Sequence, residues 1–307
     1  EEAGDELSRV WALQVSGLHA MQRSLADVAR PKLLAAVEAY RKLGARRRLE
    51  EVLHMSCVLS LREGDWRRAL VDAEELLDST REREDRQTEA WGRGNVALAH
   101  LLAGDTSRAI DSLDRVHARL DPERLPAECI LVLGLRASAA AVDGEFELVE
   151  SIADEVAGAL ERAPVAYNAI EGYAGLAEAA LLWLDAEPAE TRPREICTAA
   201  LRCLSQTAVA MAPGLSGYAL WLDGRSALLC GRQRRARRLL RRSVSRCDAA
   251  GLAVVAARAR LDLARLGGAD APQLRAEGDA ALARLEVSTV GYDSPHRKAR
   301  GERGGSR

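Results

Sequence analysis

Apolar residues recur along most of this chain at the three- and four-residue spacing of one helix face. In one stretch the apolar positions are Ala109, Ile110, Leu113, Val116 and Leu120. This spacing differs from the strict alternation of apolar and polar residues in a half-buried strand. The pattern therefore predicts an all-α protein.

A second regularity is a repeat marked by glycines. Gly64, Gly104 and Gly144 are 40 residues apart, and each follows an apolar helical run. An acid follows each glycine, and a small or branched apolar residue stands five positions after it: Asp65 and Ala69, Asp105 and Ala109, Glu145 and Val149. Gly231 and Ala236 have the same spacing, with Arg232 in place of the acid.

This repeated phrase has the chemistry of a turn between two helices. Glycine adopts the left-handed conformation that ends a helix without a Cβ penalty. The acid that follows can cap the free N–H groups at the start of the next helix. We predict about seven helical hairpins, spanning 6–43, 46–80, 86–120, 126–162, 165–211, 215–249 and 252–286. Pro31 is expected to start the second helix of the first hairpin, and Asp85 is expected to cap a helix.

A single hairpin cannot bury its own apolar stripe, so neighbouring hairpins must stack. We therefore expect residues 1–287 to form an α-solenoid, a right-handed superhelix with a concave groove. The segment 288–307 is rich in Gly and Arg and has no apolar period, which predicts a disordered basic tail.

The Gly-Asp-x-x-x-Ala phrase resembles the tetratricopeptide repeat (TPR), including a small residue seven positions before each glycine: Cys57, Ala97, Ala137 and Gly224. The period of 40 exceeds the 34 residues of that repeat, so the hairpins are TPR-like with longer helices. Segments 36–53, 64–92 and 164–183 also resemble the C-terminal helical repeats of bacterial signalling proteins. In those proteins a class III nucleotide-cyclase domain and an AAA-type ATPase module precede the repeats. The resemblance implies a sensory or scaffolding arm, with any catalytic domain upstream of Glu1.

The resemblance also implies which residues face the groove, because the first helix of each TPR hairpin lines it. The corresponding positions are Glu51, His54, Trp91, Asn95, Ser138, Glu171, Glu178, Tyr218, Trp221 and Arg225. Trp and Tyr among polar groups can anchor a bound peptide. The alternative is that the Trp residues belong to the core between repeats. Some TPR domains hold a peptide carboxylate with paired Lys and Asn, but this chain has only Lys32, Lys42 and Lys298.

The strongest local feature is a basic run in which residues 232–246 include eight arginines. Its candidate patch consists of Arg234, Arg235, Arg238, Arg241 and Arg242. One interpretation is a solvated outer helix face whose long Arg side chains cover apolar surface. The other is a patch for an acidic partner or phosphate. Nucleic acid is the less favoured ligand, since the helix has no aromatic residue for base stacking and the net charge of the chain is −2.

The cysteine pattern indicates free thiols. The six cysteines fall within helical patterns, no pair has CxxC spacing, and we expect buried thiols in a reducing, cytoplasmic setting. No paired Cys/His spacing points to a metal site, and no phosphate-binding loop points to a nucleotide cofactor. No apolar run reaches the length of a membrane span.

These features predict a non-catalytic interaction or regulatory module without a cofactor. Its partner would be another protein, a peptide or the protein's own upstream domains, and the sequence does not indicate an oligomeric state. One alternative is a ligand- or partner-sensing arm of an ATPase-type transcriptional regulator. Another is an enzyme in the groove, which would require His54, Glu171 and Glu178 to lie in one pocket.

Overall fold

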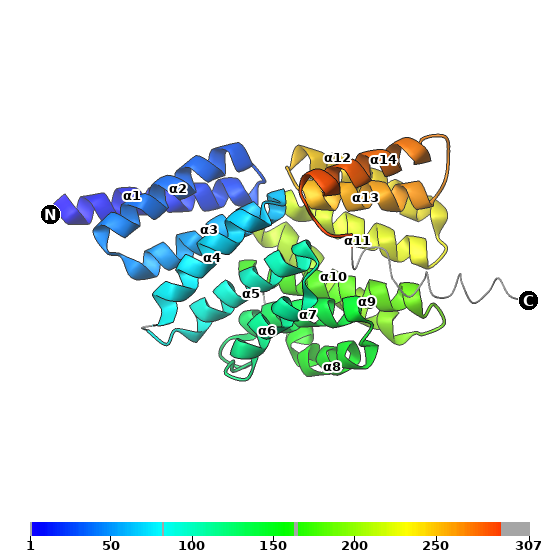
Figure 1. The fold of residues 1–307 in the computed structure, drawn as a ribbon, viewed down its shortest axis with the longest axis horizontal. Helices are drawn as coiled ribbons and strands as arrows, with labels where there is room; N and C mark the ends of the chain where they lie inside the picture. The colour runs from blue at the N-terminus through cyan, green and yellow to red at the C-terminus, as the bar shows by residue number, and fades with distance from the viewer. Residues whose placement is uncertain (1, 82, 163–164, 290–307) are drawn as a thin grey trace, which may run out of the picture.

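The computed structural model describes residues 2–81, 83–162 and 165–289 of this chain (Figure 1). Within these ranges the regular structure is helical and there is no strand. The α-helices are α1 (Glu2–Gln22), α2 (Ala26–Leu43), α3 (Arg46–Glu63), α4 (Trp66–Arg81), α5 (Arg86–Ala103), α6 (Thr106–His117), α7 (Pro126–Asp143), α8 (Phe146–Arg162), α9 (Ile170–Ala186), α10 (Arg192–Met211), α11 (Ser216–Leu229), α12 (Gln233–Ala249), α13 (Ala253–Arg265) and α14 (Ala271–Arg284). Two short 3₁₀ turns, η1 (Tyr167–Ala169) and η2 (Pro213–Leu215), precede α9 and α11.

Successive helices pack against each other along the chain. The odd-numbered helices from α3 to α13 also pack against the next odd-numbered helix. This is the packing of helical hairpins stacked side by side, and it is consistent with an α-solenoid. The prediction of an all-helical chain is therefore confirmed for the described residues.

The glycine turns form as predicted. Gly64, Gly104 and Gly144 have φ angles of 88°, 86° and 83°, the left-handed region that favours glycine. The carboxylates of Asp65 and Asp105 each accept a hydrogen bond of 3.1 Å from the backbone N–H three residues later. In the two copies of the phrase that contain Asp, the glycine thus ends one helix and the acid caps the next. Asp85 caps α5 in the same way, also at 3.1 Å.

The prediction for Pro31 is wrong. Helix α2 begins at Ala26, so Pro31 lies inside the helix and not at its start. The earlier turn is stabilised by packing: Ala29 is fully buried, and its N–H donates to the carbonyl oxygen of Leu25 at 2.9 Å. Burial of that turn outweighs the hydrogen bond that proline cannot donate.

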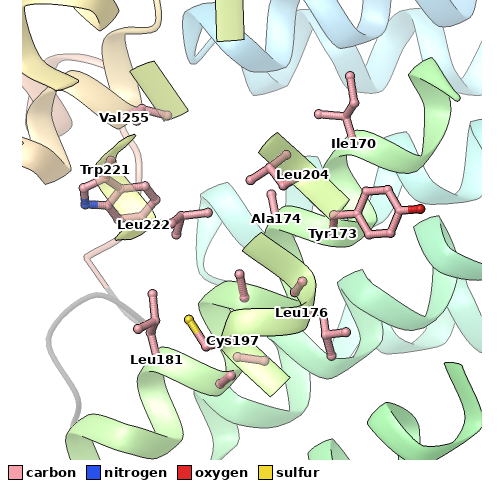
Figure 2. Packing of buried hydrophobic residues seen from close by; sticks show 14 of the residues in the cluster. Ile170, Tyr173, Ala174, Leu176, Leu181, Cys197, Leu204, Trp221, Leu222 and Val255 are labelled. Atoms are coloured by element: carbon pink, nitrogen blue, oxygen red, sulfur yellow. The ribbon is translucent and has the colours of Figure 1, made fainter. Parts of the chain in front are cut away.

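Small residues allow the central helices to approach closely. Gly134 of α7 lies against Gly172 of α9, and a Cβ added to Gly134 would lie 2.0 Å from the carbonyl oxygen of Gly172. Larger side chains fill the space beside this contact. Figure 2 shows Tyr173 and Leu176 of α9, Leu204 of α10 and other buried side chains of this core.

The chain curls until its C-terminal part meets its N-terminal part (Figure 1). Helix α13 contacts α3, and the segment after α14 crosses the turns that follow α3 and α5. There, Trp66 Nε1 donates to the carbonyl oxygen of Glu286 at 3.2 Å, and Ser288 N–H donates to that of Leu102 at 2.7 Å. The C-terminal part of the chain therefore contacts α3, α4 and α5 directly, which the sequence analysis did not predict.

Ser288, the first residue of the predicted tail, contacts the end of α5. Its backbone N–H donates a hydrogen bond to the carbonyl oxygen of Leu102, one of the carbonyl groups at the end of α5 that have no partner within the helix. Residues 290–307 of the predicted disordered tail lie outside the described residues.

Candidate functional site

Closure of the curl leaves an inner cavity of about 90 Å³. Its wall comes mainly from Leu and Val side chains of α3, α5, α7, α9 and α13. The polar and charged residues of the wall are Arg62, Ser138, Glu171, Glu178, Tyr218 and Arg258. An apolar cavity with a few convergent polar groups is the usual form of a small-ligand site.

One side of the cavity is formed by an ion pair between α3 and α9. Arg62 donates to Glu171 Oε1 through Nε at 3.1 Å and through a terminal nitrogen at 2.8 Å. Its other terminal nitrogen donates to the hydroxyl of Tyr167, whose ring lies 5.0 Å from the guanidinium carbon. The Arg62 and Glu171 side chains are only 11% and 12% exposed. Burial raises the pKa of Tyr167 to about 12, so its hydroxyl stays neutral at pH 7.

A similar arrangement between α9, α11 and α13 forms the other side. Glu178 accepts a hydrogen bond of 2.6 Å from the Tyr218 hydroxyl and one of 3.1 Å from Arg258. Burial, followed by the charge of Glu178, raises the pKa of Tyr218 well above its ordinary value. Glu171 and Glu178 are seven residues apart on α9, which places them on one face about 10.5 Å apart.

The charges on the cavity wall are balanced. Each of its two carboxylates is paired with one guanidinium, Glu171 with Arg62 and Glu178 with Arg258. Burying a further charge beside these pairs would leave that charge without a partner. The cavity is therefore suited to an uncharged molecule.

The structure brings together four of the ten predicted groove residues in this cavity: Ser138, Glu171, Glu178 and Tyr218. Trp221 and Arg225 are buried in α11. Trp221 Nε1 donates to Asp262 of α13 at 2.8 Å, as expected for the alternative in which this Trp belongs to the core.

The remaining four predicted residues lie apart from the cavity, on α3 and α5. The His54 ring stacks on Trp91 at 5.0 Å, and its Nδ1 lies 3.1 Å from Asn95 Nδ2. Burial, with a smaller effect of the Arg62 charge, lowers the pKa of His54 to about 3, so the ring is neutral at pH 7. Glu51 accepts a hydrogen bond of 3.2 Å from Gln14. His54 is not part of the cavity wall, so the predicted trio with Glu171 and Glu178 does not meet there.

The sequence analysis missed Arg62 and Arg258 of the cavity wall. For Arg62 the sequence contains a signal. Arg62 stands two residues before Gly64, and the equivalent positions before the next two glycines, Leu102 and Val142, also line the cavity. The repeat register could therefore have identified this face of α3.

The basic patch lies on the outer side of α12. All five of its arginines are exposed, whereas Ala236, Leu240 and Ser243 are buried on the opposite face. Arg235 donates two hydrogen bonds of 3.0 Å to Asp223, and Arg241 lies 3.5 Å from Asp270. The patch therefore lies on a solvent-exposed helix face, and whether it also binds an acidic partner or phosphate stays a prediction.

All six cysteines are free thiols, and Cys230 is the one that is not fully buried. Within the described part of the chain, no three His, Cys, Asp or Glu side chains are grouped as metal ligands. In the same residues, no helix combines the length and the apolar character needed to cross a membrane.

A scan of protein-family models finds no match to the chain, and a search of curated proteins finds none either.

Proposed function

We propose that this chain is a non-catalytic regulatory module that senses a small uncharged ligand in its inner cavity. Its scaffold would be about seven TPR-like hairpins in a right-handed superhelix. The observation that carries this proposal is the charge-balanced inner cavity, to which six successive odd-numbered helices from α3 to α13 contribute. Because so many hairpins meet at one point, a ligand there can alter the curvature of the whole solenoid.

The size of the cavity favours a small ligand over a peptide in the groove. A peptide helix is about 10 Å across and does not fit a cavity of 90 Å³. An apolar cavity of about 150 Å³ accepts benzene, so this one suits a compact molecule of about four non-hydrogen atoms.

The absence of catalysis is also part of the proposal. Glu171 and Glu178 are both engaged by arginines, and His54 lies elsewhere. The connection with a cyclase, an ATPase or a transcriptional regulator rests on the sequence resemblance alone. In any of these settings the module would pass ligand binding to neighbouring domains.

Butan-1-ol is a suitable probe, because it is uncharged and close to the size of the cavity. We expect saturation transfer in NMR from the protein to butan-1-ol, and little or none to butyrate or butylammonium. Ser138→Leu should abolish the signal by filling the cavity, whereas Ser151→Leu on the exposed side of α8 should preserve it. Equal signals from the three probes, or a signal that survives Ser138→Leu, would refute the proposal.

A second variant tests the size of the site without filling it. Leu101 lines the cavity, and Leu101→Ala should extend binding to longer alcohols such as hexan-1-ol. Circular dichroism establishes that each variant folds. If the enlarged cavity has the same preference for chain length as the original, the ligand does not lie there.

A further inference from the structure

A second concave site lies between α10 and the α11–α12 hairpin, and we call it the outer groove. It has a volume of about 570 Å³, several times that of the inner cavity. The lining residues described for the two sites are all different. The outer groove is therefore a separate feature and does not depend on the proposed ligand.

Positive charge dominates the outer groove. Its lining includes Arg202, Arg232, Arg235 and Arg246, against the single acid Asp223. Asp223 is paired with Arg235 by two hydrogen bonds of 3.0 Å, so its charge is already compensated. The three other arginines give the groove an excess of positive charge.

The groove also exposes apolar surface. Leu201, Val209 and Leu220 line it, and Val209 is 78% exposed. Apolar side chains flanked by arginines match a ligand that is apolar on one side and acidic at its edges. A simple anion such as phosphate would use the arginines but leave the apolar surface uncovered.

The spacing of the arginines gives the length of the ligand. Arg232 precedes α12, and Arg246 lies in its last turn, 14 residues later. At a rise of 1.5 Å per residue these positions are about 21 Å apart. Arg246 is held in place by a hydrogen bond of 2.7 Å to the Ser216 hydroxyl, which orders this end of the groove.

From this combination we infer that the outer groove is a docking site for an acidic amphipathic helix of about 14 residues from a partner protein. The apolar face of that helix covers Leu201, Val209 and Leu220, and its carboxylates reach Arg202, Arg232 and Arg246. Nucleic acid fits less well, because the lining has no aromatic side chain on which a base can stack.

The probe is a synthetic 16-residue helix with leucines on one face and glutamates at its edges, labelled with a fluorophore. Fluorescence anisotropy should show that it binds and that the same helix with lysines in place of glutamates does not. The combined variant Arg202→Gln, Arg232→Gln and Arg246→Gln should weaken binding about tenfold, from three lost rim contacts. The variant Arg234→Gln, Arg238→Gln and Arg242→Gln removes the same charge from outside the described groove lining and should bind nearly as well as the native chain.

Comparison of these two triple variants shows whether the acidic helix binds at the outer groove or is attracted only by the net positive charge of this region. Equal weakening by both would show that only net charge matters and would overturn the inference. Tighter binding of single-stranded or duplex DNA than of the acidic helix at the same salt concentration would also overturn it, in favour of nucleic acid. The inference would also be overturned if the chain forms a dimer in sedimentation experiments and the groove substitutions abolish that dimer. The groove would then be occupied by a second copy of this chain.

Cys230 offers a readout of position. It lines the outer groove and is the free cysteine that is not fully buried. The acidic helix should slow maleimide labelling of Cys230, and the lysine helix should not. An unchanged labelling rate at saturating acidic helix would place the binding elsewhere.

Discussion

The ion pair between Arg62 and Glu171 gives the most direct test of the inner cavity. The substitution Arg62→Met keeps much of the side-chain volume but removes three hydrogen bonds, two to Glu171 and one to Tyr167. Glu171 then keeps its negative charge in a nearly buried position without the cation that balances it. We expect this substitution to be among the most destabilising single changes on the cavity wall.

The expected magnitude follows from the burial of the pair. Removing one partner of a buried ion pair costs about 3–5 kcal/mol, because the remaining charge is left uncompensated. The two side chains are 11% and 12% exposed and so are not completely buried. We therefore expect the free energy of unfolding to fall by an amount near the lower end of this range, about 3 kcal/mol. The double variant Arg62→Met with Glu171→Met removes both charges and should lie within about 1 kcal/mol of the native chain.

Urea unfolding followed by circular dichroism and by Trp fluorescence measures these differences, and coincident transitions would justify a two-state treatment. Arg124→Met is the matched control, because Arg124 is 86% exposed beside Asp121 and should lose less than about 1 kcal/mol. The reasoning is refuted if Arg62→Met costs no more than this control. It is equally refuted if the double variant loses the sum of the two single losses.

Three further predictions concern packing, pH and thiol chemistry. Gly134→Ala should cost at least about 2 kcal/mol because its Cβ would collide with the backbone of Gly172. Gly158→Ala, whose Cβ would meet Arg162 at an ordinary contact of 3.7 Å, should be neutral or slightly stabilising in urea unfolding. Because the pKa of His54 in the folded chain is about 3, well below its ordinary 6.5, the unfolded chain takes up a proton first. The contribution of the neutral His54 ring to folding stability is therefore complete above pH 6.5, and it falls by up to about 1.4 kcal/mol per pH unit as the pH is lowered towards 3. The variant His54→Leu should show a weaker dependence of unfolding free energy on pH over this range. In the native protein a maleimide should label Cys230 first, and mass spectrometry that finds another cysteine labelled as fast would contradict the burial described above.

Local chemistry accounts for what could be predicted about the fold. The spacing of apolar residues predicts helices, and the glycine–acid phrase predicts the turns at Gly64, Gly104 and Gly144. Each of these features depends on residues within a few positions of one another, so the linear sequence contains them in full. Pro31 is the exception, because burial of the preceding turn outweighs the usual preference of proline for the start of a helix.

The candidate site could be predicted only in part. Helical periodicity and the resemblance to TPR hairpins selected Glu171, Glu178, Ser138 and Tyr218 as groove residues, and all four line the inner cavity. Their partners could not be identified from spacing. Arg62 is 109 residues from Glu171 in the chain, and no local pattern connects them.

The sequence by itself determined the helices, the turns between them and the faces that each helix buries. Only the tertiary structure decided that the curl closes, that α13 meets α3 and that Ser288 reaches Leu102. The physical reason is that curvature accumulates over many hairpin interfaces, each of which adds a small rotation set by side-chain packing. Whether the two ends of such a chain stay apart or come into contact depends on the sum of those rotations, and no single segment of the sequence specifies that sum.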